Sequence, residues 1–282
     1  DLFMQNNGPR FDRYRWIEND NPMEAYGNDP TDNGVKSQTA TFQLYDDGKT
    51  ATVNVTQNGN YGKATYKYTI NANGTIDLAS SFEAQGNGAR RLGFSLNFPS
   101  DMSKVRYYAR GPRASYIDRL DGEDFGLYET TVKDMYESFA HPQSNGNRIG
   151  LRWLTLTNNE GNGVKVETSG DVAFSLTPWT EAELRTARHE WELPTSNRVV
   201  AHFDAIQQGL GNKSCGPGPL PKYEIQKGKT YSNIVRFIPF SEAADDSANG
   251  ISAVVNSATT MAQVYDLSGR RLPEPPAKGF YI

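Results

Sequence analysis

The stretch "YYARGPRASYIDR", which runs from Tyr107 to Arg119, begins with aromatic residues and ends with side chains that could do chemistry. Gly111-Pro112 ends its strand-like half, because proline has no ladder donor and glycine tolerates turn geometry. The polar half then places Asp118 next to Arg119. A guanidinium and a carboxylate can form a bidentate ion pair. We predict that this pair locks the loop, and we favour that structural role over contact with a ligand because such planar pairs are common tethers.

A second polar group, "PQSNGNR", contains Asn145, Asn147 and Arg148. Amides donate and accept hydrogen bonds and a guanidinium donates them, so these side chains suit a ligand with vicinal hydroxyl groups. Asn145-Gly146 is equally typical of a tight turn. The sequence leaves both interpretations open, a ligand-facing cleft and a turn.

The three histidines offer no metal-ligand spacing. His141 lies in an expected loop, His189 at an expected helix end and His202 in an expected strand. The sequence therefore predicts no metal site. His189 is most simply a capping partner of the helix dipole, and it is also a candidate member of the ligand-facing cleft.

Acidic and thiol groups give no recognisable catalytic pair. Asp121, Glu123 and Asp124 cluster in "LDGEDFG", which we interpret as a solvated acidic loop rather than a Ca²⁺ site, although oxygen-rich loops bind that ion. Cys215 lies among Gly and Pro residues with no neighbouring histidine. A nucleophilic role for its thiol is therefore not expected.

Charge and composition argue against two classes of partner. The formal net charge is −4 and the pI is near 5.5, with Lys and Arg scattered, so we expect no nucleic-acid binding. No stretch of the sequence approaches the length of about 18 consecutive apolar residues that a membrane-spanning helix needs. The chain starts at Asp1 without an initiator methionine or a signal peptide, which suggests a piece of a longer polypeptide.

The elements that must position these side chains are mostly strands. Alternating apolar and polar residues over 50–56, 64–70, 92–98 and 163–167 predict half-buried strands. Asn-Gly dipeptides between them suit tight hairpins, so we expect an all-β, antiparallel, two-layered architecture. One short helix is predicted over about 181–190, where Thr180 and Glu183 form a capping box.

Composition changes near the end of the chain. We expect a main domain over 1–240, a small polar linker over 241–250, and a minor β-type unit over 251–282. The tail "VYDLSGRR" followed by "KGFYI" resembles the short C-terminal tails of exported bacterial proteins, cut short at Ile282. This resemblance implies a periplasmic or cell-surface location.

Several motifs between Arg15 and Phe240 occur in a telling order. "RWIEND" begins at Arg15, and Glu183-Leu184, Ala187 and His189 follow a Leu-x-x-Ala-x-His pattern. The further motifs are Gly111-Pro112, Tyr116, Asp118-Arg119, Phe125-Gly-Leu-Tyr128, Asp134-Met-Tyr136, Pro142-Gln-Ser-Asn-Gly-Asn-Arg148 and the Gly-rich loop from Gly209 to Pro217. In this order they resemble the C-terminal domain of large multidomain β-galactosidases of glycoside hydrolase family two.

The resemblance implies a large antiparallel supersandwich, similar in fold to galactose mutarotases. In that family a separate (β/α)₈ barrel supplies the two carboxylates of retaining hydrolysis, and this domain lends a loop to the rim of the active site. Asn212, Ser214 and Cys215 are the substrate-adjacent residues that this implies. Some relatives carry Asp-Ser-Trp where this chain has Lys213-Ser214-Cys215, so stacking of an aromatic ring on sugar is not expected here.

The implied function is that of a non-catalytic domain of a β-galactosidase that acts on terminal β-galactosides, with the isolated chain inactive. The implied partners are the other domains of that enzyme and its carbohydrate substrate, and an oligomer is left open. No cofactor is expected in this chain, since any metal ions used by relatives belong to the barrel. Two alternatives remain: a free-standing carbohydrate-binding β-sandwich, and a less favoured aldose mutarotase-like enzyme, which would need a histidine and a carboxylate across a cleft.

Overall fold

The computed structural model describes residues 8–17, 35–45, 48–59, 62–85, 89–211 and 217–244, together with residues 264–265 and 271–272. The chain divides into two compact units, Asp1–Ser241 and Glu242–Ile282. The strands of the first unit are β1 (Arg10–Asp12), β2 (Val35–Leu44), β3 (Thr50–Gly59), β4 (Gly62–Asn71), β5 (Ile76–Ala84), β6 (Arg91–Pro99), β7 (Lys104–Gly111), β8 (Asp124–Thr131), β9 (Arg148–Thr157), β10 (Asn162–Thr177), β11 (Arg198–Gln207) and β12 (Thr230–Ser241).

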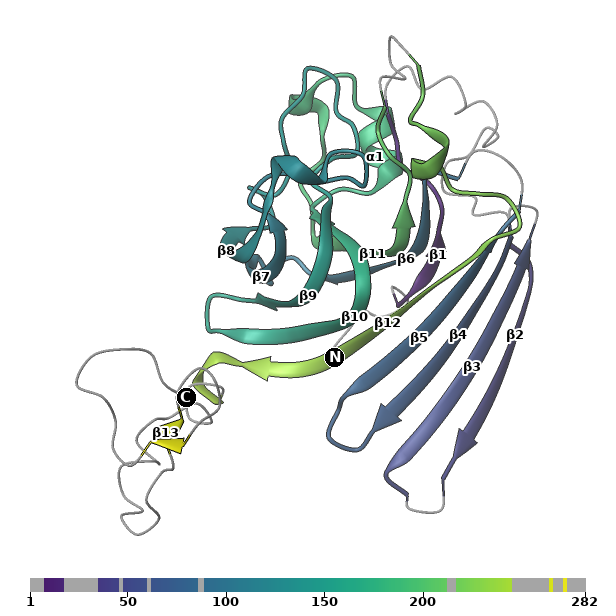
Figure 1. The fold of residues 1–282 in the computed structure, drawn as a ribbon, viewed down its shortest axis with the longest axis vertical. Coiled ribbons are helices and arrows are strands. Elements are labelled where there is room, and N and C mark those ends of the chain that lie inside the picture. Colours follow the sequence, from purple (N-terminus) through teal and green to yellow (C-terminus); the bar gives the residue numbers. More distant parts are fainter. Residues whose placement is uncertain are drawn as a thin grey trace. The chain divides into compact units, whose positions relative to one another are not determined.

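All twelve strands belong to one hydrogen-bonded sheet, and its printed pairings are antiparallel, which confirms the predicted all-β architecture. The order is β1-β6-β11-β10-β12-β5-β4-β3-β2, and β7, β8 and β9 branch from it because β9 pairs with β10. In Figure 1, β2 to β5 form one set of long strands beside the curved set that includes β6, β9, β10 and β11.

β10 connects the parts of this sheet because it is 16 residues long. Its first half, from Asn162 to Ser169, pairs with β12, and its second half, from Ala173 to Thr177, pairs with β11. Between the halves the pairing with β9 shifts register, and Gly170 has a φ of +89°. A bulge of this kind bends a strand, so one strand serves two neighbours in succession.

Aromatic packing fixes β11, the strand that leads into the candidate site. Phe203 of β11 contacts Phe94 of β6 and Phe237 of β12, with ring centroids 5.7 and 5.9 Å apart. All three rings are fully buried. Burying an aromatic side chain of this size stabilises the fold by about 1.5–3 kcal/mol. The end of β11 is therefore held against the core.

The predicted helix is shorter than expected. α1 spans Glu181–Thr186, and its capping box between Thr180 and Glu183 is confirmed. It ends at Thr186, and its C-cap Ala187 has an extended backbone, because the Arg188 N–H donates to the carboxylate of Glu192 at 2.8 Å instead of to a helical carbonyl. The described residues of this unit also form three short 3₁₀ helices, η2 (Leu120–Gly122), η3 (Glu190–Glu192) and η4 (Pro221–Tyr223).

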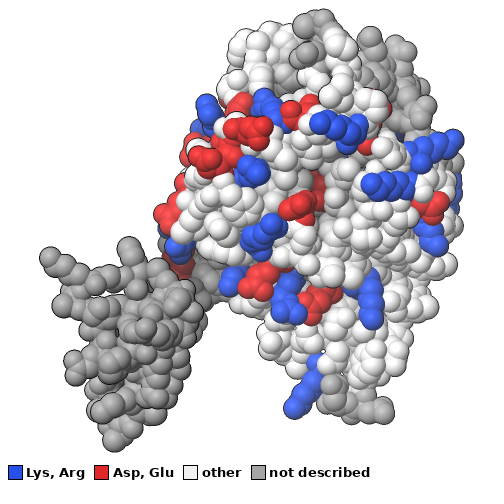
Figure 2. Space-filling model, viewed as in Figure 1, with Lys and Arg blue, Asp and Glu red and all other residues white. Residues whose placement is uncertain are grey.

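Charged side chains of both signs are interspersed on the face drawn in Figure 2, and no stripe of one sign crosses it. Among the described residues, no helix is long and apolar enough to cross a membrane.

In the second unit the structure describes residues 242–244 and the pairing of β13 (Val264–Tyr265) with β14 (Arg271–Leu272). This pair is antiparallel, with Val264 opposite Leu272. Most of the expected linker, residues 245–250, lies outside the described residues.

Candidate functional site

A pocket of about 260 Å³ opens where β11 ends. We call it the Gly209 pocket. It is lined by residues from five parts of the chain: the segment after β1, the residue before β6, the loop after β7, the loop between β8 and β9, and the segment after β11. Its described lining is Arg15, Ile17, Arg90, Ala114, Tyr116, Arg119, Glu137, Phe139, Gln143, Ser144, Asn145, Gln208, Gly209, Leu210 and Gly211.

Glycines shape the base of the loop beside this pocket. Gly211 has a φ of +56°, and a Cβ there would lie 2.4 Å from the backbone nitrogen of Pro219. Gly211 and Pro219 therefore lie close together, and a side chain at Gly211 would force them apart. Asn212, Ser214 and Cys215, the expected substrate-adjacent residues, lie outside the described residues.

Asp118 anchors this loop base. Its Oδ2 accepts a 2.8 Å hydrogen bond from the backbone N–H of Gly211. A Cβ on Gly209 would lie 2.8 Å from the Asp118 carboxyl carbon, so the carboxylate packs directly against the glycine backbone. The loop that follows β7 thus holds the loop that follows β11.

The predicted ion pair between Asp118 and Arg119 is wrong, because the two side chains have separate partners. The Arg119 guanidinium lies over the ring of Tyr116, 5.1 Å from its centroid, and donates to the carbonyl of Ala114 at 3.3 Å. Arg15 lies 5.3 Å from the same ring. The two neighbouring side chains therefore point in different directions. Asp118 binds the backbone of Gly211, and Arg119 packs on the ring of Tyr116.

The sequence left open that Arg148 faces a ligand-binding cleft, but in the structure it does not. It is buried, and its guanidinium donates to the carbonyls of Met135, Gly146 and Pro112 at 2.9, 2.6 and 2.7 Å. A buried guanidinium needs such partners to offset the loss of water. Its two terminal nitrogens, Nη1 and Nη2, therefore donate within the fold.

Asn147 is likewise buried, and its amide bridges the carbonyl of Ser115 and the side chain of Gln207, both at 2.8 Å. Asn145 is the one member of the predicted set that lines the Gly209 pocket. Its amide already contacts the backbone N–H and carbonyl of Glu137, both at 2.8 Å. The predicted ligand-facing cleft therefore does not form, and the turn interpretation fits better.

His189 lies outside the described lining of the Gly209 pocket. Its ring stacks on Trp191 with centroids 4.2 Å apart, and its Nδ1 is 3.2 Å from the carboxylate of Glu192. It does not cap α1, which ends three residues earlier. The expected helix-dipole role is wrong for that reason.

The acidic loop is only partly solvated. Glu123 is buried, and its carboxylate accepts from the backbone N–H and the Nε of Arg113, both at 3.0 Å. Asp121 and Asp124 are exposed. Within the described part of the chain, no three His, Cys, Asp or Glu side chains lie where they could hold a metal ion together.

Sequence reasoning missed a buried charged cluster next to the Gly209 pocket. Arg91 lies 3.2 Å from Asp12 and 3.7 Å from both Asp204 and Glu181. His202 Nδ1 lies 2.5 Å from Asp12. Gln207 joins Asp204, at 2.9 Å, to Arg15, at 2.7 Å. The signal in the sequence is His202 and Asp204 two residues apart on one face of an apolar strand.

The two aspartates of this cluster titrate in opposite directions. Burial would raise the pKa of Asp12, but Arg91 and His202 overcome that effect and lower the pKa to about 2. Burial raises the pKa of Asp204 to about 6 despite the attraction of Arg91. At neutral pH the Asp12 carboxylate beside Arg91 is therefore fully ionised, whereas the pKa of Asp204 lies only about one unit below neutral pH.

Comparison with known proteins gives a consistent result. Residues 3–237 match the family described as "Beta galactosidase small chain". A β-galactosidase from Lactobacillus delbrueckii subsp. bulgaricus is 31% identical over 181 residues, which are 62% of this chain and 18% of that protein. A β-galactosidase from Arthrobacter sp. (strain B7) is 30% identical over 141 residues, which are 48% of this chain and 14% of that protein. The chain matches less than a fifth of the length of these relatives.

Among solved structures, an aldose epimerase homologue from C. elegans is similar, with a TM-score of 0.39 and 10% identity over 72% of this chain and 68% of that one. A likeness at this level carries no inference about activity.

Proposed function

Since the chain belongs to the Beta galactosidase small chain family, we propose that it is the C-terminal domain of a larger β-galactosidase. The intact enzyme would hydrolyse terminal β-galactosides, and this domain would act as scaffold and as donor of a loop at the active-site rim. The observation that supports this role is the loop base, where Gly211 is fixed by Asp118 and lies against Pro219.

A non-catalytic role is supported by the groups that line the Gly209 pocket. Retaining glycoside hydrolysis needs two carboxyl groups about 5 Å apart, one acidic and one ionised. The described lining of this pocket contains one carboxylate, Glu137, and three arginines. In the buried cluster, Arg91 and His202 overcome the effect of burial and lower the pKa of Asp12 to about 2, which disfavours an acid role for that carboxyl group.

The loop role follows from positional constraint. A segment that reaches a substrate contributes to catalysis only when its path is fixed, because small displacements cost much of the gain from positioning. The loop base, where Asp118 holds Gly211 close to Pro219, would supply that constraint. Ser214 would offer a hydroxyl to the substrate, and Cys215 would contribute shape rather than stacking, since a thiol has no flat face.

The further proposals concern context. The other domains of the same enzyme would be the main partners, and the exported-type tail favours a periplasmic or cell-surface location. A free-standing carbohydrate-binding module is the second candidate, favoured by the polar pockets of this unit, and sugar binding without any effect on hydrolysis would distinguish it.

The test uses the isolated chain and the intact enzyme at matched molar concentration with an aryl β-galactoside. The proposal expects no turnover by the isolated chain above a buffer control and ready turnover by the intact enzyme. Activity of the isolated chain that co-purifies with it through several orthogonal columns would overturn the non-catalytic role.

A further inference from the structure

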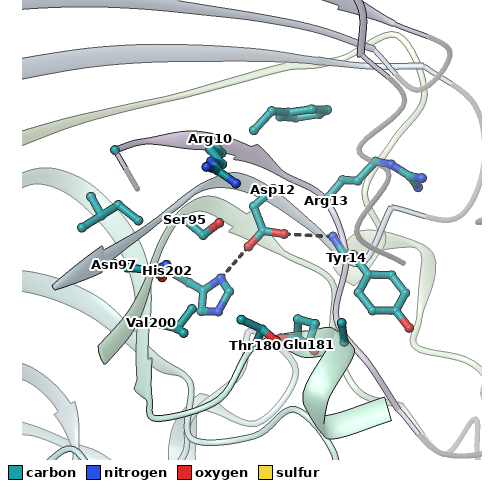
Figure 3. A pocket seen from close by; sticks show the side chains of 14 residues that line it. Arg10, Asp12, Arg13, Tyr14, Ser95, Asn97, Thr180, Glu181, Val200 and His202 are labelled. Carbon is teal, nitrogen blue, oxygen red and sulfur yellow. Dashed lines mark hydrogen bonds and ion pairs between the residues drawn. The ribbon is translucent and has the colours of Figure 1, made fainter. Parts of the chain in front are cut away.

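A second pocket, of about 190 Å³, lies at the N-terminal strand of the unit and shares no described lining residue with the Gly209 pocket. We call it the His202 pocket. Figure 3 shows the imidazole of His202 inside it, with the carboxylate of Asp12 on one side and Thr180 and Val200 on the other. Strands β1, β6 and β11 and the start of α1 supply the walls.

His202 is held there in an unusual state for a buried side chain. Its side chain is 4% exposed, and its Nδ1 is bound to Asp12 at 2.5 Å. Its Nε2 is buried with no hydrogen-bond partner among the described residues. This nitrogen has almost no exposed surface, although its residue lines the pocket. A buried polar atom without a partner costs about 1–3 kcal/mol, so a small shift of the pocket wall that let a ligand hydroxyl reach this nitrogen would recover that cost.

The chemistry of the ligand atom follows from the Asp12 contact. When His202 is neutral, its Nδ1 hydrogen points at the carboxylate and Nε2 accepts a hydrogen bond; when His202 is protonated, Nε2 donates. A hydroxyl group satisfies either state, because it both donates and accepts. An amine or a carbonyl satisfies only one of them.

The walls favour an uncharged, hydroxylated molecule. Two arginines, Arg10 and Arg13, and two carboxylates, Asp12 and Glu181, line the pocket, so the formal charges of these four groups cancel. Leu96 and Val200 add apolar surface that suits the C–H face of a sugar ring. At about 30 Å³ per water molecule, the space equals about six waters, which is the scale of one sugar ring.

We propose that the His202 pocket is a binding site for a single uncharged monosaccharide unit, held by hydrogen bonds from its hydroxyl groups to the Asp12–His202 pair. The site is independent of the proposed loop function, since it uses other residues. A ligand with about twelve heavy atoms binds weakly, and the affinity is expected in the millimolar range.

The three histidines of the chain make the test direct. The full 282-residue chain is labelled with ¹³C at histidine Cε1, and the His202 signal is assigned by its loss in His202→Asn. D-galactose and D-glucose are then titrated to about 100 mM. The proposal expects a saturable shift of the His202 signal with at least one of these sugars, while the signals of His141 and His189 stay in place.

A matched pair of variants separates pocket binding from general effects of the solute. Ala182 lines the His202 pocket, whereas Thr186, one turn further along α1, does not. Ala182→Phe should fill part of the pocket and weaken the sugar affinity at least ten-fold, and Thr186→Phe should leave it within two-fold. Circular dichroism checks that both variants fold.

Three outcomes would overturn the proposal. The first is no shift of the His202 signal up to the highest sugar concentration. The second is a shift with inorganic phosphate and none with either sugar, which would make the arginines an anion site. The third is an unchanged sugar affinity in folded Ala182→Phe.

Discussion

Replacing Asp118 by alanine should impair the intact enzyme more than it destabilises the domain. The substitution removes the acceptor of the 2.8 Å hydrogen bond from the Gly211 N–H. Bonds to a charged acceptor contribute about 1.5–3 kcal/mol, and the half-buried position of Asp118 places this one at the low end because solvent screens it. If the loss falls entirely on substrate positioning, about 1.4 kcal/mol corresponds to a ten-fold lower kcat/KM.

The assay is steady-state kinetics of the intact enzyme on an aryl β-galactoside, with thermal unfolding in parallel. Asp118→Asn keeps an acceptor oxygen and should recover part of the lost kcat/KM. Asp121→Ala, which removes an exposed carboxylate nearby, should match the parent. If the loss fell instead entirely on the stability of the domain, the Asp118→Ala midpoint would drop by about 3–6 °C, so the expected drop is smaller than this. A lower midpoint with kcat/KM within two-fold of the parent would refute the link between the anchor and the substrate.

Two further predictions concern the buried polar groups. The pKa of Asp204 is raised from 3.8 to about 6 in the folded state, so the folded state binds more protons than the unfolded state between these pH values. The resulting stabilisation of the folded state is complete below pH 3.8 and is lost as the pH rises through 6. It amounts to about 3 kcal/mol at most. Between pH 5 and 8 the free energy of unfolding measured in urea should fall by about half of this amount in the parent and by less in Asp204→Asn. Equal falls in the two proteins would contradict the assignment. Arg148→Met should lower the free energy of unfolding by about 3 kcal/mol, because three carbonyls lose their donor. Asn145→Ala should lower it by about 1 kcal/mol. Similar losses for both variants in the same unfolding assay would show that Arg148 does not contribute more to stability than Asn145.

The strands were predictable because their pattern is local. The alternation over 64–70 lies within β4 (Gly62–Asn71), and that over 92–98 lies within β6 (Arg91–Pro99). Period-two burial depends on neighbouring residues alone. The capping box of α1 is equally local, since Thr180 and Glu183 are three residues apart.

The side-chain roles were less predictable because they depend on contacts far along the chain. Asp118 and Gly211 are 93 residues apart, and Asp12 and His202 are 190 apart. Arg148 looks like a surface residue from its type, and only the convergence of carbonyls from Met135 and Pro112 explains its burial. Ion-pair chemistry alone suggested pairing Asp118 with Arg119, but the backbone directs their side chains to different partners.

The central claim, that this domain lends a loop to the active-site rim, is tested most directly by deleting residues 212–217 in the intact enzyme. Loss of substrate positioning predicts a fall in kcat/KM on the order of a hundred-fold, with a thermal midpoint close to that of the parent. Cys215→Ala is the matched control and should stay within a few-fold of the parent. A deletion variant that folds and keeps the parent's kcat/KM would contradict the claim, because the loop would then not reach the substrate.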